Sequence, residues 1–372
     1  MKNSAIVIGA GIVGLATARA LAEKNYHVKV FERNEKCVGA SVRNFGLIWP
    51  IGQPSGKLYQ RALRSREIWL DIIQKSKIWH SNAGALMLAY TDDERNVLEE
   101  FFQNNCDTRD LELFTNQQIS ERWETVNPQG LKAGLLSKTE VIIDPREAIN
   151  TLADYLNECY GIEFYFGKTI NRIEQFKVWN GKDIYEADQI FVCSGSDFET
   201  LFSEEYKESG ITKCKLQMMR SLPINATESD LPALCAGLTL SHYASFADCK
   251  SMEILKQRFE NEMPEYVKHG IHVMAVQNGK NEITIGDSHE YGLNPDPFDR
   301  AEINQFVLQY MAKFTRFENL QIAQTWNGVI PKLEGQTEFI FSPQQGVTII
   351  NRLGGGGMTL SFALAEEVIA TI

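Results

Sequence analysis

A glycine-rich turn near the start of the chain has the spacing of a dinucleotide-binding loop. Gly9, Gly11 and Gly14 form a GxGxxG motif between a short apolar run at residues 4–8 and a helical pattern over residues 12–23. The first glycine permits a tight turn, the second lets the backbone approach a pyrophosphate, and the third lets helix and strand pack closely. The free N–H groups at the helix start would then face the phosphates.

An acidic residue lies where such a loop needs one. Glu32 ends a second apolar run, residues 28–32, 18 positions after Gly14. A carboxylate there accepts hydrogen bonds from the adenosine ribose. Residues 4–32 thus predict a strand, a helix and a parallel strand joined by a right-handed crossover. A chance cluster of glycines in a packed turn is the alternative, and it would not explain the acidic residue.

A second glycine-rich segment distinguishes between the dinucleotides. Residues 351–359 read NRLGGGGMT and lead into an amphipathic helical pattern over residues 360–372. Consecutive glycines indicate a backbone pressed against a flat or anionic group. A nicotinamide enzyme usually needs no second segment of this kind, so the pattern favours FAD over NAD. A flexible tail is the alternative, but an amphipathic helix would not follow it.

Composition excludes several classes of protein. The 372 residues carry a net charge of −11, which argues against a nucleic-acid partner because phosphates need a basic face. The seven cysteines form no CxxC pair, so reduced thiols in a cytoplasm are expected and no metal site is predicted. Residues 1–22 superficially resemble a secretory signal, but their spaced glycines favour the nucleotide loop. No apolar run reaches transmembrane length, so no membrane span is predicted.

The length predicts two domains. The fold class expected is α/β, α+β overall: an FAD-binding Rossmann-type domain and an interleaved substrate domain built on a mixed, largely antiparallel sheet. Short apolar runs between residues 215 and 286, residues 237–240 among them, are bounded by turn residues and predict that sheet. The FAD-binding domain is assigned residues 1–82, 144–214 and 324–372, and the substrate domain residues 83–143 and 215–323.

At this point the ordered motifs resemble a known family. The nucleotide loop with Glu32 is followed by Gly39-Ala40-Ser41, a helix start at Asp144-Pro145, a strand ending in Cys193-Ser194-Gly195, the turn Trp326-Asn327-Gly328 and the terminal glycine run. The whole chain is similar to the D-amino-acid oxidase superfamily of FAD enzymes, which includes glycine oxidase and sarcosine oxidase. It departs from the family pattern at Asn327, Ile330 and Cys193-Ser194, which concerns ring stacking and substrate fit.

Four segments resemble a narrower subgroup associated with aminophosphonate breakdown. They are residues 42–50 (VRNFGLIWP), 217–220 (QMMR), 286–290 (GDSHE) and 357–362 (GMTLSF). The resemblance implies that a small amine, an amino acid or an aminophosphonate, is oxidised by hydride transfer to flavin N5, giving an imine that hydrolyses. The electron acceptor is O2 or another, unidentified acceptor. One alternative is a glycine- or sarcosine-type oxidase or dehydrogenase, and another is a non-catalytic dinucleotide-binding protein.

The resemblance also implies the site residues. FAD is expected to bind without a covalent bond, at Gly9, Gly11, Ile12, Val13, Gly14, Glu32, Arg33, Ser41, Ile170, Gly195, Trp326, Gly354, Gly355, Gly356, Gly357, Met358 and Thr359. Arg43, Asn44 and His242 are the substrate-binding candidates, since an arginine can grip carboxylate or phosphonate oxygens with two hydrogen bonds. Arg43 could instead serve the FAD phosphate.

For several further side chains the sequence supports only a less specific expectation. Met218, Arg220, Tyr243, His289 and Glu290 could form a wall of the substrate site, although each is more often structural in such a position. Arg61, Arg64 and Arg66 recur along one predicted helix and read most simply as a solvated face.

Overall fold

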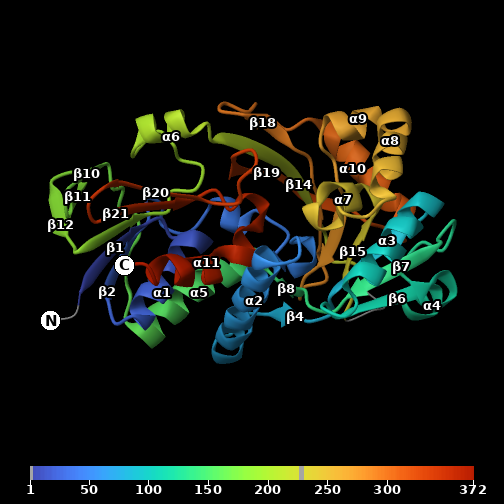
Figure 1. Cartoon of the computed structure of the whole chain (residues 1–372), viewed down its shortest axis with the longest axis horizontal. Helices are drawn as coiled ribbons and strands as arrows, with labels where there is room; N and C mark the ends of the chain where they lie inside the picture. Colours follow the sequence, from blue (N-terminus) through green and yellow to red (C-terminus); the bar gives the residue numbers. More distant parts are fainter. Residues whose placement is uncertain (1–2, 226–229) are drawn as a thin grey trace.

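The computed structural model describes residues 3–225 and 230–372, which form two lobes around two large sheets (Figure 1). The first sheet has six strands in the order β20-β21-β13-β1-β2-β9. Their bounds are Phe339–Gln344 (β20), Val347–Asn351 (β21), Gln189–Val192 (β13), Ser4–Ile8 (β1), His27–Phe31 (β2) and Glu163–Tyr165 (β9). All pairs are parallel except the hairpin of β20 and β21. The predicted parallel unit is therefore confirmed, and an antiparallel hairpin ends the sheet on one side.

Three helices cover one face of this sheet. α1 (Ile12–Glu23) packs against α5 (Pro145–Tyr160) and α11 (Gly357–Ile369), and α2 (Lys57–Lys75) packs on the outer side of α11. The core between them is apolar and includes Leu15, Leu21, Ile149 and Leu364. α5 starts as expected, because the Asp144 side chain accepts a hydrogen bond from the Arg146 backbone N–H at 3.0 Å.

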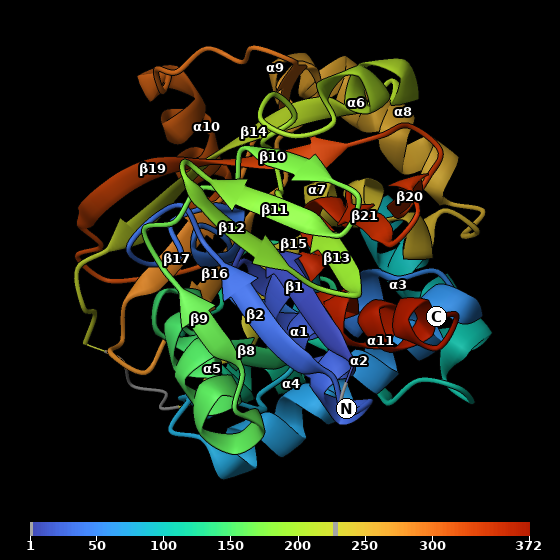
Figure 2. The same ribbon diagram turned by 90° about the vertical axis from the view of Figure 1, so that its left-hand side faces the viewer.

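The other face of the sheet is covered by an antiparallel meander that the sequence did not predict. It consists of β10 (Arg172–Glu174), β11 (Lys177–Asn180) and β12 (Asp183–Glu186), and Figure 2 shows it in front of β1 and β13. Val178 of the meander packs with Ile6, Phe31 and Ile190 of the sheet. The short helix α6 (Ser203–Ser209) adds Tyr206 to the same core.

The second sheet has nine strands in the order β18-β14-β17-β16-β15-β5-β7-β6, with β19 paired to β14. Its strands are β5 (Ala85–Ala89), β6 (Leu111–Thr115), β7 (Ala133–Ser137), β14 (Thr212–Ser221), β15 (Ala233–Ala236), β16 (Met274–Gln277), β17 (Ile283–Gly286), β18 (Glu290–Gly292) and β19 (Ile322–Lys332). Only β5 and β15 are paired in parallel among these described strands. The predicted mixed, largely antiparallel sheet is confirmed.

Helices surround the second sheet, and a small third sheet joins the lobes. The helices are α3 (Asp92–Asn105), α4 (Asn116–Arg122), α7 (Gly237–His242), α8 (Met252–Glu262), α9 (Pro264–Lys268) and α10 (Ala301–Phe314). β3 (Leu47–Ile48) and β4 (His80–Ser81) both pair with β8 (Val141–Ile143). Within the described ranges, no helix combines the length and apolar character needed to cross a bilayer.

Two expectations about local structure were wrong. Residues 237–240 form the start of α7 rather than a strand, because β15 ends at Ala236 and the Leu238 N–H then donates to the Tyr310 hydroxyl at 2.9 Å. A short apolar run alone does not separate a buried strand from a buried helix turn. Arg61 is buried rather than solvated, and its guanidinium pairs with Glu338 and Glu367.

The predicted fold class is confirmed, whereas the division into two domains stays a prediction. Two strands cross predicted boundaries. β14 spans the boundary between residues 214 and 215, β19 spans the one between residues 323 and 324, and the two strands pair with each other in the second sheet.

Candidate active site

A groove of about 320 Å³ runs over the carboxyl ends of β1 and β2, at the N-terminus of α1. Its lining includes Gly9, Gly11, Glu32, Arg33, Ser41, Ile170 and Gly195. Open α/β sheets bind their ligands at this end of the strands. This first groove, the nucleotide groove, therefore has the position that the GxGxxG motif predicts.

The first and third glycines of the motif are required by the backbone around them. Gly9 has φ +106°, and a Cβ there would lie 2.4 Å from the carbonyl oxygen of Cys193. A Cβ on Gly14 would lie 1.8 Å from the carbonyl oxygen of Gly9. Gly14 thus allows α1 to pack directly on the turn, while Gly11 itself lines the groove.

Glu32 lies in the nucleotide groove and is held in place by neighbouring backbone. One carboxylate oxygen accepts a hydrogen bond from the Ala10 N–H at 3.0 Å. The other accepts from the Asn34 backbone N–H at 3.0 Å and from its side-chain amide at 2.8 Å. The carboxylate is thereby fixed beside the turn, where ribose hydroxyls would donate to it.

A second cavity of about 340 Å³ adjoins the nucleotide groove and is called the central cavity below. The two share the lining residues Ala40, Ser41, Arg43, Gly195 and Pro331, so they form one elongated path. The central cavity is lined on one side by the glycine-rich segment 354–359, which leads into α11. Two residues of its lining, Trp49 and Arg352, each have a buried side-chain N–H group (Nε1 and Nε) with no acceptor among the described residues.

These features fit an extended dinucleotide. A pyrophosphate would lie at the start of α1, where the N–H groups of the first turn have no partner within the helix, although Ser41 occupies that of Ile12. A flat ring would fit against the glycine segment, where backbone without side chains leaves room for it.

The structure brings together nearly all of the predicted cofactor residues. Fifteen of them line the two spaces: Gly9, Gly11, Glu32, Arg33, Ser41, Ile170 and Gly195 in the nucleotide groove, and Ile12, Val13, Gly354, Gly355, Gly356, Gly357, Met358 and Thr359 in the central cavity. Gly14 acts in packing instead. Trp326 makes other contacts, since its Nε1–H donates to the Arg43 carbonyl at 3.3 Å and Arg146 lies over its ring.

The three substrate-binding candidates also line the central cavity. Arg43 is exposed and uses one N–H group to contact the Asn327 carbonyl at 3.0 Å. Asn44 donates to the carbonyls of Ala40 and Ser41 and accepts from the Gly46 N–H, so its amide shapes the loop that carries Arg43. His242 faces the open cavity from the end of α7.

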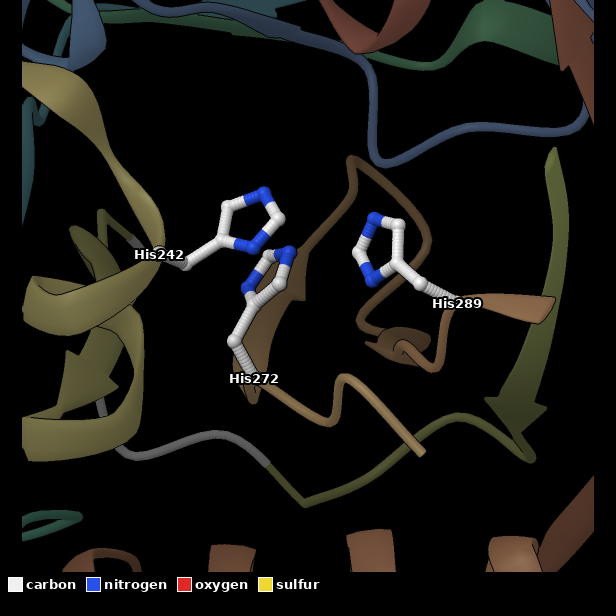
Figure 3. A group of neighbouring side chains, drawn as sticks. All are labelled: His242, His272 and His289. Atoms are coloured by element: carbon white, nitrogen blue, oxygen red, sulfur yellow. The ribbon is translucent and has the colours of Figure 1, made fainter. Parts of the chain in front are cut away.

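His242 belongs to a group of three histidines, shown in Figure 3. Its ring stacks on His272 at a centroid distance of 3.9 Å and on His289 at 4.7 Å. His272 Nε2 lies 2.9 Å from a carboxylate oxygen of the buried Asp287. All four residues line the central cavity, and we call the three histidines the histidine cluster.

Burial controls protonation in this wall. It lowers the pKa of His289 to about 4. The pKa of His242, whose side chain is open to the cavity, is also lowered, by desolvation within the wall and by the neighbouring histidines. The pKa of Asp287 is lowered although its burial acts in the opposite direction, because His272 and His289 stabilise the carboxylate. Burial also raises the pKa of Tyr243 well above its ordinary value. At neutral pH the wall therefore holds a carboxylate, a phenol and uncharged His242 and His289.

Sequence reasoning missed three residues of this wall: His272, Asp287 and Lys332, which also line the cavity. It also proposed two residues that are engaged elsewhere. The guanidinium of Arg220 pairs with Asp144 at 3.3 Å and Glu282 at 3.2 Å, and Glu290 lies 3.5 Å from Lys215. No spacing signal marks the missed residues, since His272 and Lys332 are separated from the other segments by long stretches of chain.

The model of the DAO family, whose description is FAD dependent oxidoreductase, matches residues 4–371 of the chain. The chain belongs to this family. FAD is therefore the cofactor of this oxidoreductase. The residues that line the nucleotide groove and the central cavity would hold it.

Curated relatives of the oxidoreductase act on different substrates. A D-amino acid dehydrogenase of Helicobacter pylori (strain ATCC 700392 / 26695) is 26% identical over 259 residues, covering 53% of this chain and 61% of the relative. A glycerol 3-phosphate dehydrogenase of Caloramator mitchellensis is 23% identical over 198 residues, covering 51% of this chain and 41% of the relative. The matches thus cover about half of the relatives' length.

Solved structures share the whole fold. L-proline dehydrogenase from P. horikoshii superposes with a TM-score of 0.80 at 20% identity, covering 99% of this chain and 92% of that one. Glycine oxidase from Geobacillus kaustophilus gives a TM-score of 0.77 at 16% identity, covering 99% and 94%. At these identities the likeness establishes the fold.

Proposed function

We propose that the oxidoreductase oxidises a small amine that carries an acid group, an amino acid or an aminophosphonate, by oxidative deamination. The observation that supports this most directly is the central cavity, where the glycine segment for the flavin faces a wall with cationic and neutral polar groups. The named relatives and structural neighbours include enzymes of amino acids, which agrees with this proposal.

The cavity wall has the composition of a small-molecule site. Phe45, Leu216, Met218, Met274 and Ile330 are apolar and line it together. They would hold the carbon that loses hydrogen and would exclude water, while a few polar groups fix orientation. FAD, when bound, would supply the acceptor for the hydride that leaves the carbon bearing the amine, and water would hydrolyse the imine product.

The acid group needs a cation, and Arg43 is the first candidate. Its guanidinium lines the cavity and contacts one carbonyl, which leaves N–H groups for a ligand. Arginine grips carboxylate or phosphonate oxygens through two parallel hydrogen bonds. Arg220, by contrast, is committed to two carboxylates and is no longer a candidate.

The details of substrate and acceptor belong to the same proposal. The aminophosphonate is supported by the four segments that resemble the phosphonate-associated subgroup, and glycine or sarcosine is the alternative substrate. O2 is the first acceptor to test. We also propose non-covalent FAD and a cytoplasmic location, the latter supported by seven free thiols in the structure.

A substrate panel tests the proposal. Purified holoenzyme is mixed anaerobically with glycine, sarcosine, D-alanine, 2-aminoethylphosphonate and its N-methyl derivative, and flavin absorbance is followed. We expect at least one of these amines to bleach the flavin with stoichiometric formation of an aldehyde or keto product. Bleaching by glycerol 3-phosphate or a 2-hydroxy acid alone would contradict the assignment to amines.

A further inference from the structure

Arg352 has a backbone conformation that long side chains rarely adopt. It follows the last residue of β21, and its φ is +70°. Glycine takes this left-handed conformation without steric cost, whereas an arginine there is an outlier. The turn is held by Asn351, whose Oδ1 accepts from the Arg352 backbone N–H at 2.7 Å. The Asn351 amide in turn donates to the Gly195 carbonyl and the Tyr206 hydroxyl, both at 2.8 Å. An arginine kept where glycine would fit the backbone better indicates a role for its side chain.

The guanidinium of Arg352 is short of partners. The residue is only 9% exposed, and burial lowers its pKa, although arginine stays charged at neutral pH. Its Nε–H is buried without an acceptor among the described residues. Its two terminal nitrogens have no acceptor there either, but they are not buried. Since Arg352 lines the central cavity, these terminal nitrogens are the atoms that a bound group can reach.

The carboxylates nearby do not neutralise this cation. Glu338 is the acid whose charge acts on Arg352, but both of its oxygens accept from Arg61, at 3.0 and 3.1 Å. Asp287, the acid in the lining of the cavity, lies 2.9 Å from His272 instead. A charge taken out of water without a committed partner is costly, so a group that brings negative charge to the cavity would be favoured there.

Two sources of negative charge fit the position of Arg352 poorly. The pyrophosphate of FAD belongs to the GxGxxG turn in the nucleotide groove, and Arg352 lies outside the lining of that groove. The acid group of a substrate is expected nearer the wall with the histidine cluster, and the cavity cation whose charge acts on His242 and His289 is Lys332.

The flavin ring is the source that does fit. Arg352 lies directly before the glycine segment 354–359, the part of the lining that leaves room for a flat ring. A hydride brings two electrons and one proton, so its arrival at N5 turns a neutral ring into an anion unless a second proton follows from solvent. This negative charge is spread over N1 and the neighbouring C2 carbonyl. A charge-assisted hydrogen bond therefore stabilises the reduced ring more than the uncharged oxidised one.

We propose that the guanidinium of Arg352 contacts the N1–C2 carbonyl edge of the flavin ring and stabilises its reduced, anionic form. The contact raises the reduction potential of the bound FAD and so favours hydride transfer to it. The strained turn at Arg352 fixes this cation beside the ring position before reduction takes place. The inference concerns the cofactor, and it holds whichever substrate the enzyme oxidises.

Two variants of the purified holoenzyme test the proposal without any substrate. Arg352→Gly suits the backbone and removes the cation, whereas Arg352→Lys keeps the charge and loses the planar fork. The reduction potential is measured against a dye of known potential. Sulfite affinity is measured by titration, because sulfite adds to N5 through its sulfur lone pair and leaves the same negative charge on the ring.

Arg352→Gly should lower sulfite affinity at least about tenfold, the loss expected for a charge-assisted hydrogen bond. It should also lower the reduction potential by at least about 30 mV, which is a tenfold change for a two-electron couple. Arg352→Lys should recover part of both losses. A potential and a sulfite affinity that stay at the wild-type values in Arg352→Gly would overturn the proposal.

Lys332→Met is the matched control, because it removes a cation from the same cavity on the side of the histidine cluster. It should shift the potential by less than Arg352→Gly does. An equal shift would mean that any cation of the cavity acts on the ring at a distance, and the assignment to Arg352 would be wrong.

The remaining outcomes separate this role from its rivals. Weaker FAD binding at an unchanged potential would assign Arg352 to another part of the cofactor, and weaker binding of acid-bearing amines alone would assign it to the substrate; either result contradicts the proposal. A crystal structure of the wild-type holoenzyme decides the matter if Arg352→Gly loses FAD. A guanidinium nitrogen within about 3 Å of N1 or of the C2 carbonyl oxygen supports the proposal, and a guanidinium turned away from the ring refutes it.

Discussion

The Oγ atom of Ser41 accepts a hydrogen bond from the Ile12 backbone N–H at 2.9 Å. This contact closes the loop that carries Arg43 onto the first turn of α1, at the junction of the nucleotide groove and the central cavity. The hydroxyl thereby occupies a helix N–H that a phosphate would otherwise meet. A Cβ on Gly11 would lie 3.1 Å from the same oxygen. Little space therefore separates the loop of Ser41 from the glycine turn.

Gly11→Val should abolish FAD binding, because its side chain would fill the place where the pyrophosphate approaches the backbone. FAD per chain, measured by absorbance after gel filtration, provides the test. Asp154→Val, which introduces the same side chain at an exposed position of α5, should keep FAD. A folded Gly11→Val protein that keeps the wild-type amount of FAD per chain would contradict the assignment of the nucleotide groove to FAD.

Glu32→Gln should weaken FAD binding while the protein still folds. The loss of charge-assisted hydrogen bonds to the ribose should cost ~1.5–3 kcal/mol, which corresponds to about a ten- to hundredfold rise in Kd. The structure adds a second contribution, since the carboxylate also accepts from the Ala10 and Asn34 N–H groups. Titration of the apoprotein with FAD measures the effect. An unchanged Kd would mean that Glu32 only stabilises the turn.

Arg43→Lys and Arg43→Ala should both lower kcat/KM for an amine with an acid group, with alanine the worse. Lysine keeps the charge and loses the planar fork, so we expect losses of about ten- to hundredfold for alanine and smaller ones for lysine. FAD content should hold in both. Arg172→Ala, at an exposed arginine of β10, is the matched control. Parallel loss of FAD would instead assign Arg43, which lines both spaces, to the cofactor.

His289→Gln should make the protein less sensitive to mild acid. A histidine whose pKa is lowered in the folded state binds fewer protons there than in the unfolded state, so stability falls as pH drops from about 6.5 towards 4. Removing this group should recover ~1–3 kcal/mol of the free energy of unfolding lost between pH 7 and pH 4.5. Urea unfolding of the holoenzyme at both pH values measures this. His289 also helps to lower the pKa of Asp287, but that carboxylate takes up its proton below pH 4, outside this window. Parallel curves for wild type and variant would contradict the buried neutral state of His289.

The cofactor half of the fold could be predicted because its signals are local. The apolar run of β1, the glycine turn and the periodicity of α1 lie within one short stretch, and the structure places all three at the predicted residues. The terminal glycine run could also be read, and the helix expected after it is present as α11, but this helix is buried on nearly all sides rather than amphipathic. The composition and residue spacing within each such segment are enough to predict its structure.

The substrate wall could not be predicted in the same way. His242, His272 and His289 come together only because β15, β16 and β17 are neighbours in one sheet, and no sequence spacing encodes that order. The partners of arginines are equally hidden: Arg220 and Arg61 are both buried in ion pairs with residues far along the chain. The short run at residues 237–240 was ambiguous between strand and helix, and tertiary contacts with Tyr310 decided it.

The central claim is that an amine with an acid group delivers its electrons to FAD bound along the two joined spaces. Anaerobic stopped-flow mixing of the holoenzyme with the amine panel tests this most directly, because loss of oxidised flavin absorbance reports the reductive step without any assumption about the electron acceptor. We predict saturable bleaching by at least one small amino acid or aminophosphonate, together with release of ammonia or methylamine. A holoenzyme that stays oxidised with every amine, and is reduced by a hydroxy acid or glycerol 3-phosphate, would contradict the account.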